Sequence, residues 1–352
     1  MSIIDYIEIS FIKGIGKSTI KQIYEEFADI GAVLKNPELL KEQFGQKVYL
    51  SIKNRDSSLR KKAEEEYRKA SKKDIKILTL QDENYPSMLK EIPDPPSFLY
   101  ASSEIPDVPL ISVVGSRKHT YYGKSVTREI VKKLVENGIG IVSGLASGID
   151  RIAHETALEN NGFTIAVLGG GIDRIFPYEN RDIYTKIKKE GVLISEFPIG
   201  QKPTRYTFPI RNRIIAGLSA GVIVTEASER SGALITARTA NEYGRVVFSV
   251  PSNINNPYGK GCNILLKEGA IPLTGIEDVF ENLPYLDKKE SPAYMDISDV
   301  EKLILDSINQ PVHIDLLSEK TNIDTEQIIV ILFEMEIKGL LTVENGIVVR
   351  NI

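Results

Sequence analysis

The chain has 352 residues, of which 42% are hydrophobic and 26% charged, and this balance is typical of globular proteins and not of disordered ones. The length predicts two or three domains. No apolar run is long enough to span a membrane, and the first residues lack a basic segment followed by an apolar one, so we expect a cytoplasmic protein. One cysteine, Cys262, and three histidines exclude an internal disulfide and a structural zinc site, and we expect no metal or cofactor.

The formal net charge of −4 is unevenly divided along the chain. Residues 1–80 carry 16 Lys and Arg against 12 Asp and Glu, residues 281–352 carry 6 against 14, and 22 of each lie between them. A neutral domain still binds phosphates where its cations cluster, because association follows the local potential. Clusters of cations therefore matter more here than the net charge.

Residues 1–70 alternate helical apolar patterns with short breaks. The segment Phe11-Ile-Lys-Gly-Ile-Gly-Lys-Ser-Thr predicts a helix-hairpin-helix (SAM-like) domain in which Ser18 caps a helix beginning near Thr19. Such a hairpin directs backbone N–H groups at a phosphate, and Lys13 and Lys17 would add charge. A hairpin that only packs in a helical bundle is an equal alternative. A phosphate-binding loop of a nucleoside triphosphatase is excluded, because Phe11 stands where that motif needs glycine.

Residues 71–107 contain two proline clusters, Tyr85-Pro86 and Ile92-Pro-Asp-Pro-Pro96, which forbid a continuing helix. We expect a proline-rich connector packed on the domain that follows. Residues 108–283 alternate continuously apolar runs with helical stretches, as in an α/β, Rossmann-like, doubly wound parallel sheet. The predicted strands are the runs LISVV, GIGIVS, TIAVL, VLIS, GVIVT and RVVFSV.

The last part of the chain is predicted to be a winged-helix domain, residues 297–352, after a linker at 284–296. Three helices are expected at 300–308, 314–321 and 324–338, followed by a hairpin with its turn at Asn345-Gly346. The third helix carries Asp324, Glu326, Glu334 and Glu336 against Lys338 alone, which would repel phosphates. We therefore expect this domain to contact protein or only to pack.

Glycines follow three of the predicted parallel strands. They occur in Gly115-Ser116-Arg117, in the segment 143–150 with Gly144 and Gly148, and in Gly169-Gly170-Gly171. Each turn alone is consistent with ordinary loop geometry. Because the carboxyl ends of parallel strands meet at one edge, the three together predict a crevice whose backbone N–H groups bind phosphate. A dehydrogenase is disfavoured, because Arg174 stands where the dinucleotide motif needs its last glycine.

The segment 205–213 adds cations and an aromatic ring. We expect Pro209 to fix the start of a helix and to leave Arg211 and Arg213 in its first turn, where each cation is unfavourable by ~0.3–1 kcal/mol unless an anion binds. Arg205 would be a third cation, and Phe208 would stack on a base, an interaction worth ~1–3 kcal/mol. The alternative is that one arginine, Arg213 above all, pairs with a core carboxylate such as Glu226.

Two further groups follow the later strands. Ser231 and Gly232 place N–H donors at another helix start. Glu226 is the one credible catalytic residue, because a carboxylate beside a phosphate site can activate water. His154 lies within a helix and has no matching Ser or Cys, so we expect a structural role.

Four motifs together closely resemble the DNA-processing protein A (DprA, also called Smf) family. They are GSR at 115, SGLASGIDRIAH from 143, FPIRNRIIAGLS from 208 and SERSGALITARTANEYGRVVFSVP from 228. The resemblance covers nearly the whole chain. It implies a cytosolic homodimer, paired through the Rossmann-like domain, that protects incoming single-stranded DNA in natural transformation and homologous recombination and loads the recombinase RecA onto it. It implies no enzymatic activity, and it implies a DNA pocket formed by Arg117, Arg205, Phe208, Arg211 and Arg213.

The sequence therefore predicts a single-stranded-DNA-binding protein without catalysis. The first alternative is a nucleotide-processing hydrolase of the same Rossmann-like superfamily that uses Glu226, and a nucleotide-sensing regulator is a third class. The FPIRNR stretch favours DNA. The predicted DNA-binding residues are Lys13, Lys17, Gly115, Ser116, Arg117, Gly144, Gly148, Gly170, Arg205, Phe208, Arg211, Asn212, Arg213, Ser231 and Gly232.

Overall fold

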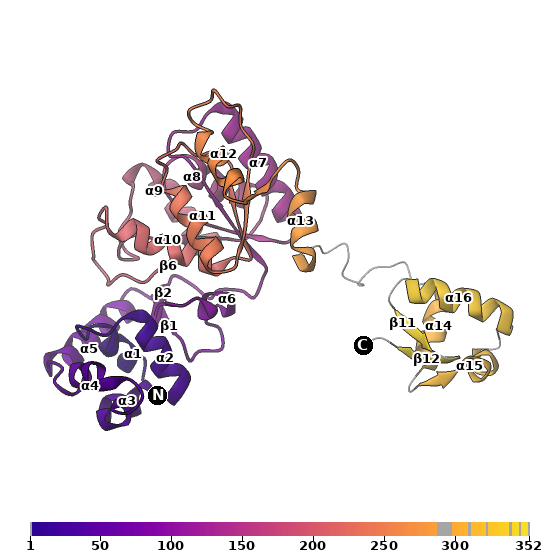
Figure 1. Cartoon of the computed structure of the whole chain (residues 1–352), viewed down its shortest axis with the longest axis horizontal. Coiled ribbons are helices and arrows are strands. Elements are labelled where there is room, and N and C mark those ends of the chain that lie inside the picture. The colour runs from indigo at the N-terminus through magenta and orange to yellow at the C-terminus, as the bar shows by residue number, and fades with distance from the viewer. Residues whose placement is uncertain are drawn as a thin grey trace. The chain divides into compact units, whose positions relative to one another are not determined.

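The computed structural model describes residues 2–286, 298–308, 311–321, 323–337, 340–344 and 346–350. The chain divides into two compact units, Met1–Leu286 and Asp287–Ile352 (Figure 1). The first unit contains both the helical N-terminal region and the large sheet. Each unit is described by itself.

The N-terminal region is helical, as predicted, and its elements are α1 (Ile3–Ser10), α2 (Lys17–Phe27), α3 (Ile30–Lys35), η1 (Pro37–Leu40), α4 (Gly45–Lys53) and α5 (Ser58–Ser71). Their apolar faces meet around fully buried Ile7, Ile23 and Ile52. The prediction that Ser18 caps the second helix is wrong. Gly16 takes the extended N-cap conformation instead, so α2 begins at Lys17 and Ser18 lies in its first turn.

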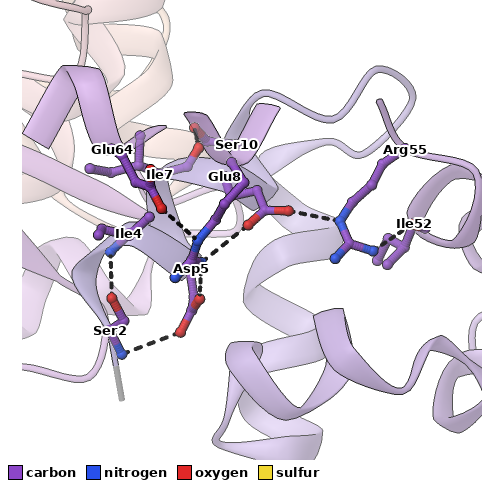
Figure 2. A network of polar contacts seen from close by, with 10 residues as sticks. Ser2, Ile4, Asp5, Ile7, Glu8, Ser10, Ile52, Arg55 and Glu64 are labelled. Carbon is purple, nitrogen blue, oxygen red and sulfur yellow. Dashed lines mark hydrogen bonds and ion pairs between the residues drawn. The ribbon is translucent and has the colours of Figure 1, made fainter. Parts of the chain in front are cut away.

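A polar network fixes the entry of α1 (Figure 2). Ser2 and Asp5 form a reciprocal capping box, with Ser2 N–H donating to Asp5 Oδ2 at 3.3 Å. Glu8 is 4% exposed, and its carboxylate accepts from Arg55 Nε at 2.8 Å and Arg60 Nη1 at 3.2 Å. Both arginines are therefore engaged inside the domain, which lowers the positive charge that the N-terminal region presents outside.

The large sheet has nine strands in the order β1-β2-β6-β5-β4-β3-β7-β8-β9. The six predicted strands are confirmed as β3 (Leu110–Val114), β4 (Gly140–Ser143), β5 (Thr164–Val167), β6 (Val192–Ser195), β7 (Gly221–Val224) and β8 (Val246–Ser249), all parallel to their neighbours in this set. The proline-rich segment was expected to be a connector packed on the sheet domain, and no strand was predicted in it. It supplies β1 (Lys76–Thr79), α6 (Ser87–Glu91) and β2 (Phe98–Ala101). The strand β2 pairs antiparallel with β6, and β1 pairs antiparallel with β2 at the edge of the sheet.

Alternate residues of β3 face two separate cores, as the two-residue period of a strand requires. Ile111 and Val113 pack on one side with α7 (Tyr121–Glu136) and α8 (Ile149–Glu159). Leu110 and Val114 pack on the other with α9 (Arg181–Glu190), α10 (Thr207–Leu218) and α11 (Ala233–Glu242). The unit is completed by η2 (Tyr178–Asn180), α12 (Lys260–Lys267), β9 (Ile271–Pro272), α13 (Glu277–Asn282) and η3 (Pro284–Leu286).

The second unit is a small α/β domain. Its elements are α14 (Asp299–Ser307), β10 (Val312–His313), α15 (Ile314–Thr321), α16 (Thr325–Ile337), β11 (Leu341–Glu344) and β12 (Ile347–Arg350), with strand order β10-β12-β11. Three helices and a hairpin match the predicted winged helix, and Glu326 and Glu334 on α16 are exposed. The predicted linker beyond Leu286, Lys338 and the turn residue Asn345 lie outside the described residues. In the described part of the chain, no helix combines the length and the apolarity that a membrane span needs.

Candidate functional site

The main groove of the first unit lies where the order of the parallel sheet reverses. Strand β3 has β4 on one side and β7 on the other, so the chain segments that follow β3 and β7 diverge at their carboxyl ends. A groove of about 690 Å³ opens there. Its walls are the loop after β3, the first turns of α10 and α11, and the side chain of Tyr258.

Nine of the fifteen predicted residues line this groove, namely Gly115, Ser116, Arg117, Arg205, Phe208, Arg211, Asn212, Ser231 and Gly232. Lys118 and Arg230 line it as well. Arg117, Lys118, Arg205 and Arg230 are exposed, and within residues 2–286 none of them has a carboxylate oxygen within 4 Å. The groove therefore gathers four cations that are open to an external anion.

Phe208 is half-buried and lines the same groove as these cations. The guanidinium groups of Arg117 and Arg211 lie 5.5 and 5.9 Å from the centre of its ring, and the Phe176 ring lies 5.6 Å away at an angle of 37°. Planar guanidinium groups and aromatic rings are both surfaces on which nucleic-acid bases stack. Phosphate-binding and base-stacking groups are thus adjacent.

Arg211 is buried and held in place by the backbone. Its Nη1 donates to the carbonyl oxygen of Gly144 at 2.5 Å and to that of Val167. Burial lowers the pKa of Arg211 to about 10, partly offset by nearby Asp150, so the guanidinium remains charged at neutral pH. Arg211 therefore contributes fixed positive potential to the groove floor.

The prediction that Arg211 and Arg213 stand in the first helical turn is wrong. The helix α10 begins at Thr207, whose hydroxyl exchanges hydrogen bonds with Thr204, so Pro209 is the third helical residue and both arginines lie in the second turn. Proline is tolerated there because the first N–H groups of a helix have no internal partner. The helix-dipole argument, which acts within the first turn, does not apply to either arginine.

The glycines after β4 and β5 do not line the groove. Asp150, buried near Arg211, accepts the N–H groups of Gly144 at 3.2 Å and Ala146 at 3.3 Å, so a side chain of the protein already occupies the Gly144 donor that was expected to hold phosphate. Burial raises the pKa of Asp150, while Arg211 acts in the opposite direction. Gly144 and Gly148 instead permit close packing: a Cβ at Gly144 would meet the Arg211 guanidinium at 2.7 Å, and one at Gly148 would meet the Ser116 carbonyl oxygen at 2.3 Å.

Gly170 packs against a different segment. A Cβ there would lie 2.9 Å from the Gln201 carbonyl oxygen and from Pro203. Its own carbonyl oxygen accepts the hydroxyl of Ser195 at 2.7 Å. Gly170 therefore packs against the loop that leads to Arg205, and it does not line the groove.

Arg213 points away from the groove into an ion-pair cluster. It pairs with Glu196 and, at 3.4 Å, with Asp94. The alternative that Arg213 pairs with a buried carboxylate is therefore correct, but the partner is Glu196 and not Glu226. Lys17 binds the same Glu196 oxygen at 2.6 Å, and burial lowers the pKa of Lys17. Lys17 and Arg213 thus join the N-terminal helices to the sheet. Lys13 is exposed on the N-terminal region and does not line the groove.

Glu226, the candidate catalytic residue, faces the start of α7 and is 2% exposed. Its two carboxylate oxygens accept the backbone N–H of Thr120 at 2.7 Å and the Thr120 hydroxyl at 2.6 Å. It does not line the groove, and its contacts hold Thr120, whose hydroxyl caps α7. His154 is fully buried, its Nδ1 lies 2.7 Å from the Thr164 hydroxyl, and burial lowers its pKa to about 3.

Sequence reasoning missed twelve of the twenty-one residues that line the groove, among them Lys118, Asp150, Arg230 and Tyr258. Lys118 and Arg230 directly adjoin Arg117 and Ser231, so extending those two motifs by one residue would have found them. Tyr258 arrives from the segment before α12, and no local pattern marks it. Within the described residues, no group of three or more His, Cys, Asp or Glu side chains is placed to hold a metal ion.

These features define a class of protein: a Rossmann-like domain with a cationic groove at its topological switch point, combined with a separate winged helix. The family model described as DNA recombination-mediator protein A matches residues 76–284, and the DprA winged helix domain matches residues 288–346. The chain belongs to the DNA recombination-mediator protein A (DprA/Smf) family.

Individual relatives agree with this assignment. Protein Smf of Synechocystis sp. is 36% identical over 383 aligned positions, which cover 96% of each chain. The X-ray structure of DNA processing protein A from Streptococcus pneumoniae matches with a TM-score of 0.68 and 35% identity, covering 80% of this chain and 98% of that one. The Helicobacter pylori protein, whose structure describes its single-stranded-DNA-binding mode, matches with a TM-score of 0.54 and 32% identity over 60% of this chain and 96% of its own.

Proposed function

We propose that the groove binds single-stranded DNA. The observation that carries the proposal is that four exposed cations, none with a carboxylate oxygen within 4 Å among residues 2–286, line one groove together with the Phe208 ring. Arg117, Lys118, Arg205 and Arg230 would contact successive phosphates. A base can reach Phe208 only when it is unpaired and unstacked, so the ring favours a single strand over a duplex. The related H. pylori protein, described as binding single-stranded DNA, supports the same assignment.

We propose further that the protein protects incoming DNA in the cytoplasm and loads RecA onto it, as a homodimer formed through the Rossmann-like domain. Membership of a recombination-mediator family supports this part of the proposal. We infer that the groove acts by binding and not by catalysis. In favour of this, both oxygens of Glu226 are engaged by Thr120, and His154 is enclosed in the core.

Fluorescence anisotropy with labelled oligo-dT and with a duplex of equal length tests the proposal on the full chain. We expect the single strand to bind at least about tenfold more tightly than the duplex, because only unpaired bases reach Phe208. Equal affinities, or no binding of oligo-dT, would overturn the proposal. A chromatographic nucleotide-hydrolysis assay runs beside it, in which turnover that disappears in Glu226→Gln would favour a hydrolase instead.

A further inference from the structure

A second group of aromatic and cationic side chains lies outside the groove, on the segment between β5 and α9. Tyr178 is 68% exposed, and the Arg181 guanidinium lies 5.8 Å from the centre of its ring. Arg181 Nη1 also donates to the Tyr178 hydroxyl at 2.8 Å. Phe176, 48% exposed, precedes this pair and packs on Phe208, which lines the groove. Aromatic surface therefore continues from the groove toward Tyr178.

The backbone around this pair is anchored beside the groove. Asn180 Nδ2 donates to the Leu145 carbonyl oxygen at 2.9 Å, and the Ser147 hydroxyl donates to the Glu179 carboxylate. Leu145 and Ser147 flank Ala146, which lines the groove. The pair thus lies at the carboxyl edge of the sheet, over the turn after β4, while the groove lies over β3 and β7.

The charges around the pair leave Arg181 available to an anion. Asp182 pairs with Arg151 at 2.6 Å, and Glu179 accepts the Ser147 hydroxyl. Within residues 2–286, Arg181 has no carboxylate oxygen within 4 Å. An isolated tyrosine–arginine pair on a surface is common and needs no ligand. Here the pair continues a run of aromatic rings out of a cationic groove. It adds one ring and one cation, which are the groups that bind a base and a phosphate.

We propose that Tyr178 and Arg181 form an outer nucleotide subsite, which rests on the proposed single-strand binding by the groove. A strand leaving the groove passes Phe176, stacks one base on the Tyr178 ring and places a phosphate on Arg181. The outer subsite lengthens the DNA track without using the N-terminal hairpin or the winged helix.

Because the chain contains no tryptophan, Tyr178→Trp introduces a single fluorescent indole at the outer subsite. We expect its emission to be quenched when a twenty-nucleotide oligo-dT binds, since base stacking quenches indoles. Tyr285 is the matched control. It is 70% exposed and lies beside Leu110 and Ala220, at the amino ends of β3 and β7, so Tyr285→Trp should not be quenched.

The affinity of the double variant Tyr178→Ala/Arg181→Ala for the same oligonucleotide decides the proposal. We expect a loss of about tenfold and a salt dependence shallower by about 0.7 in log–log slope, because one stacked base and one phosphate contact are removed. Both side chains are exposed, so the variant should fold normally. A loss of less than threefold, or a loss without quenching in Tyr178→Trp, overturns the outer subsite.

The two proposals fail in distinguishable ways. If the wild type binds oligo-dT and Arg117→Ala weakens binding while the double variant does not, only the outer subsite is wrong. If the wild type does not bind oligo-dT, or if Arg117→Ala leaves the affinity unchanged, the function proposed for the groove is wrong. The outer subsite, which depends on that function, is then wrong as well.

Discussion

Replacement of Arg117 by alanine tests the proposed phosphate contacts in the groove. Arg117 is exposed, has no carboxylate within 4 Å among residues 2–286, and contacts the Phe208 ring at 5.5 Å. A hydrogen bond to a charged group contributes ~1.5–3 kcal/mol, and exposure to solvent places Arg117 at the lower end of this range. We therefore expect a loss of about tenfold in affinity for oligo-dT, with stability changed by less than about 0.5 kcal/mol.

The salt dependence separates a phosphate contact from a general effect on the fold. For single strands the log–log slope changes by about 0.7 for each phosphate contact, so Arg117→Ala should be shallower by that amount. Arg117→Lys keeps the charge but loses the planar guanidinium, and should keep the wild-type slope with weaker binding. Lys132→Ala is the control, because Lys132 is exposed on α7 and about 16 Å along the helix from its first residue. An affinity loss below threefold in Arg117→Ala, or an unchanged slope, would refute the reasoning.

Three further predictions concern the fold and the second unit. Glu196→Ala leaves Lys17 and Arg213 without their shared carboxylate and should lower the free energy of unfolding by about 3 kcal/mol in urea titrations, whereas a loss below about 1 kcal/mol would contradict the cluster's role. Burial lowers the pKa of His154 from 6.5 to about 3, so between these pH values the imidazole is protonated in the unfolded chain and neutral in the folded one. The free energy of unfolding should therefore fall as pH decreases from 6.5 toward 3. His154 contributes up to about 1.4 kcal/mol per pH unit to the slope of the unfolding free energy against pH, and His154→Gln should lack this contribution. Equal slopes in the wild type and the variant would show that His154 is not the cause. Truncation after Leu286 should leave affinity for oligo-dT within about threefold, since the acidic α16 would repel phosphates, and a tenfold loss would contradict this.

The parallel core of the sheet was predictable because strands buried on both faces give continuous apolar runs. All six predicted strands exist. The strands β1 and β2 were missed because prolines separate them, so the local pattern resembles a connector. Their place at the edge of the sheet depends on pairing with β6, which is distant in sequence.

The site was predictable in its residue types but not in their roles. Arg211 and Arg213 look alike in the sequence, yet Arg211 reaches the groove floor while Arg213 pairs with Glu196 and Asp94, and Asp94 lies more than a hundred residues away. The glycines at 144 and 148 looked like phosphate donors. Local spacing could not show that the Asp150 carboxylate accepts the N–H groups of Gly144 and Ala146, because this depends on how the turn closes on itself.

Amide hydrogen exchange of the full chain, with and without a saturating oligo-dT, tests the central claim most directly, because it locates the bound strand without any substitution. We predict slower exchange in the segments 115–118, 205–212 and 228–236, which form the walls of the groove. Slower exchange confined to the N-terminal helices or to the winged helix, with these three segments unchanged, would contradict the account.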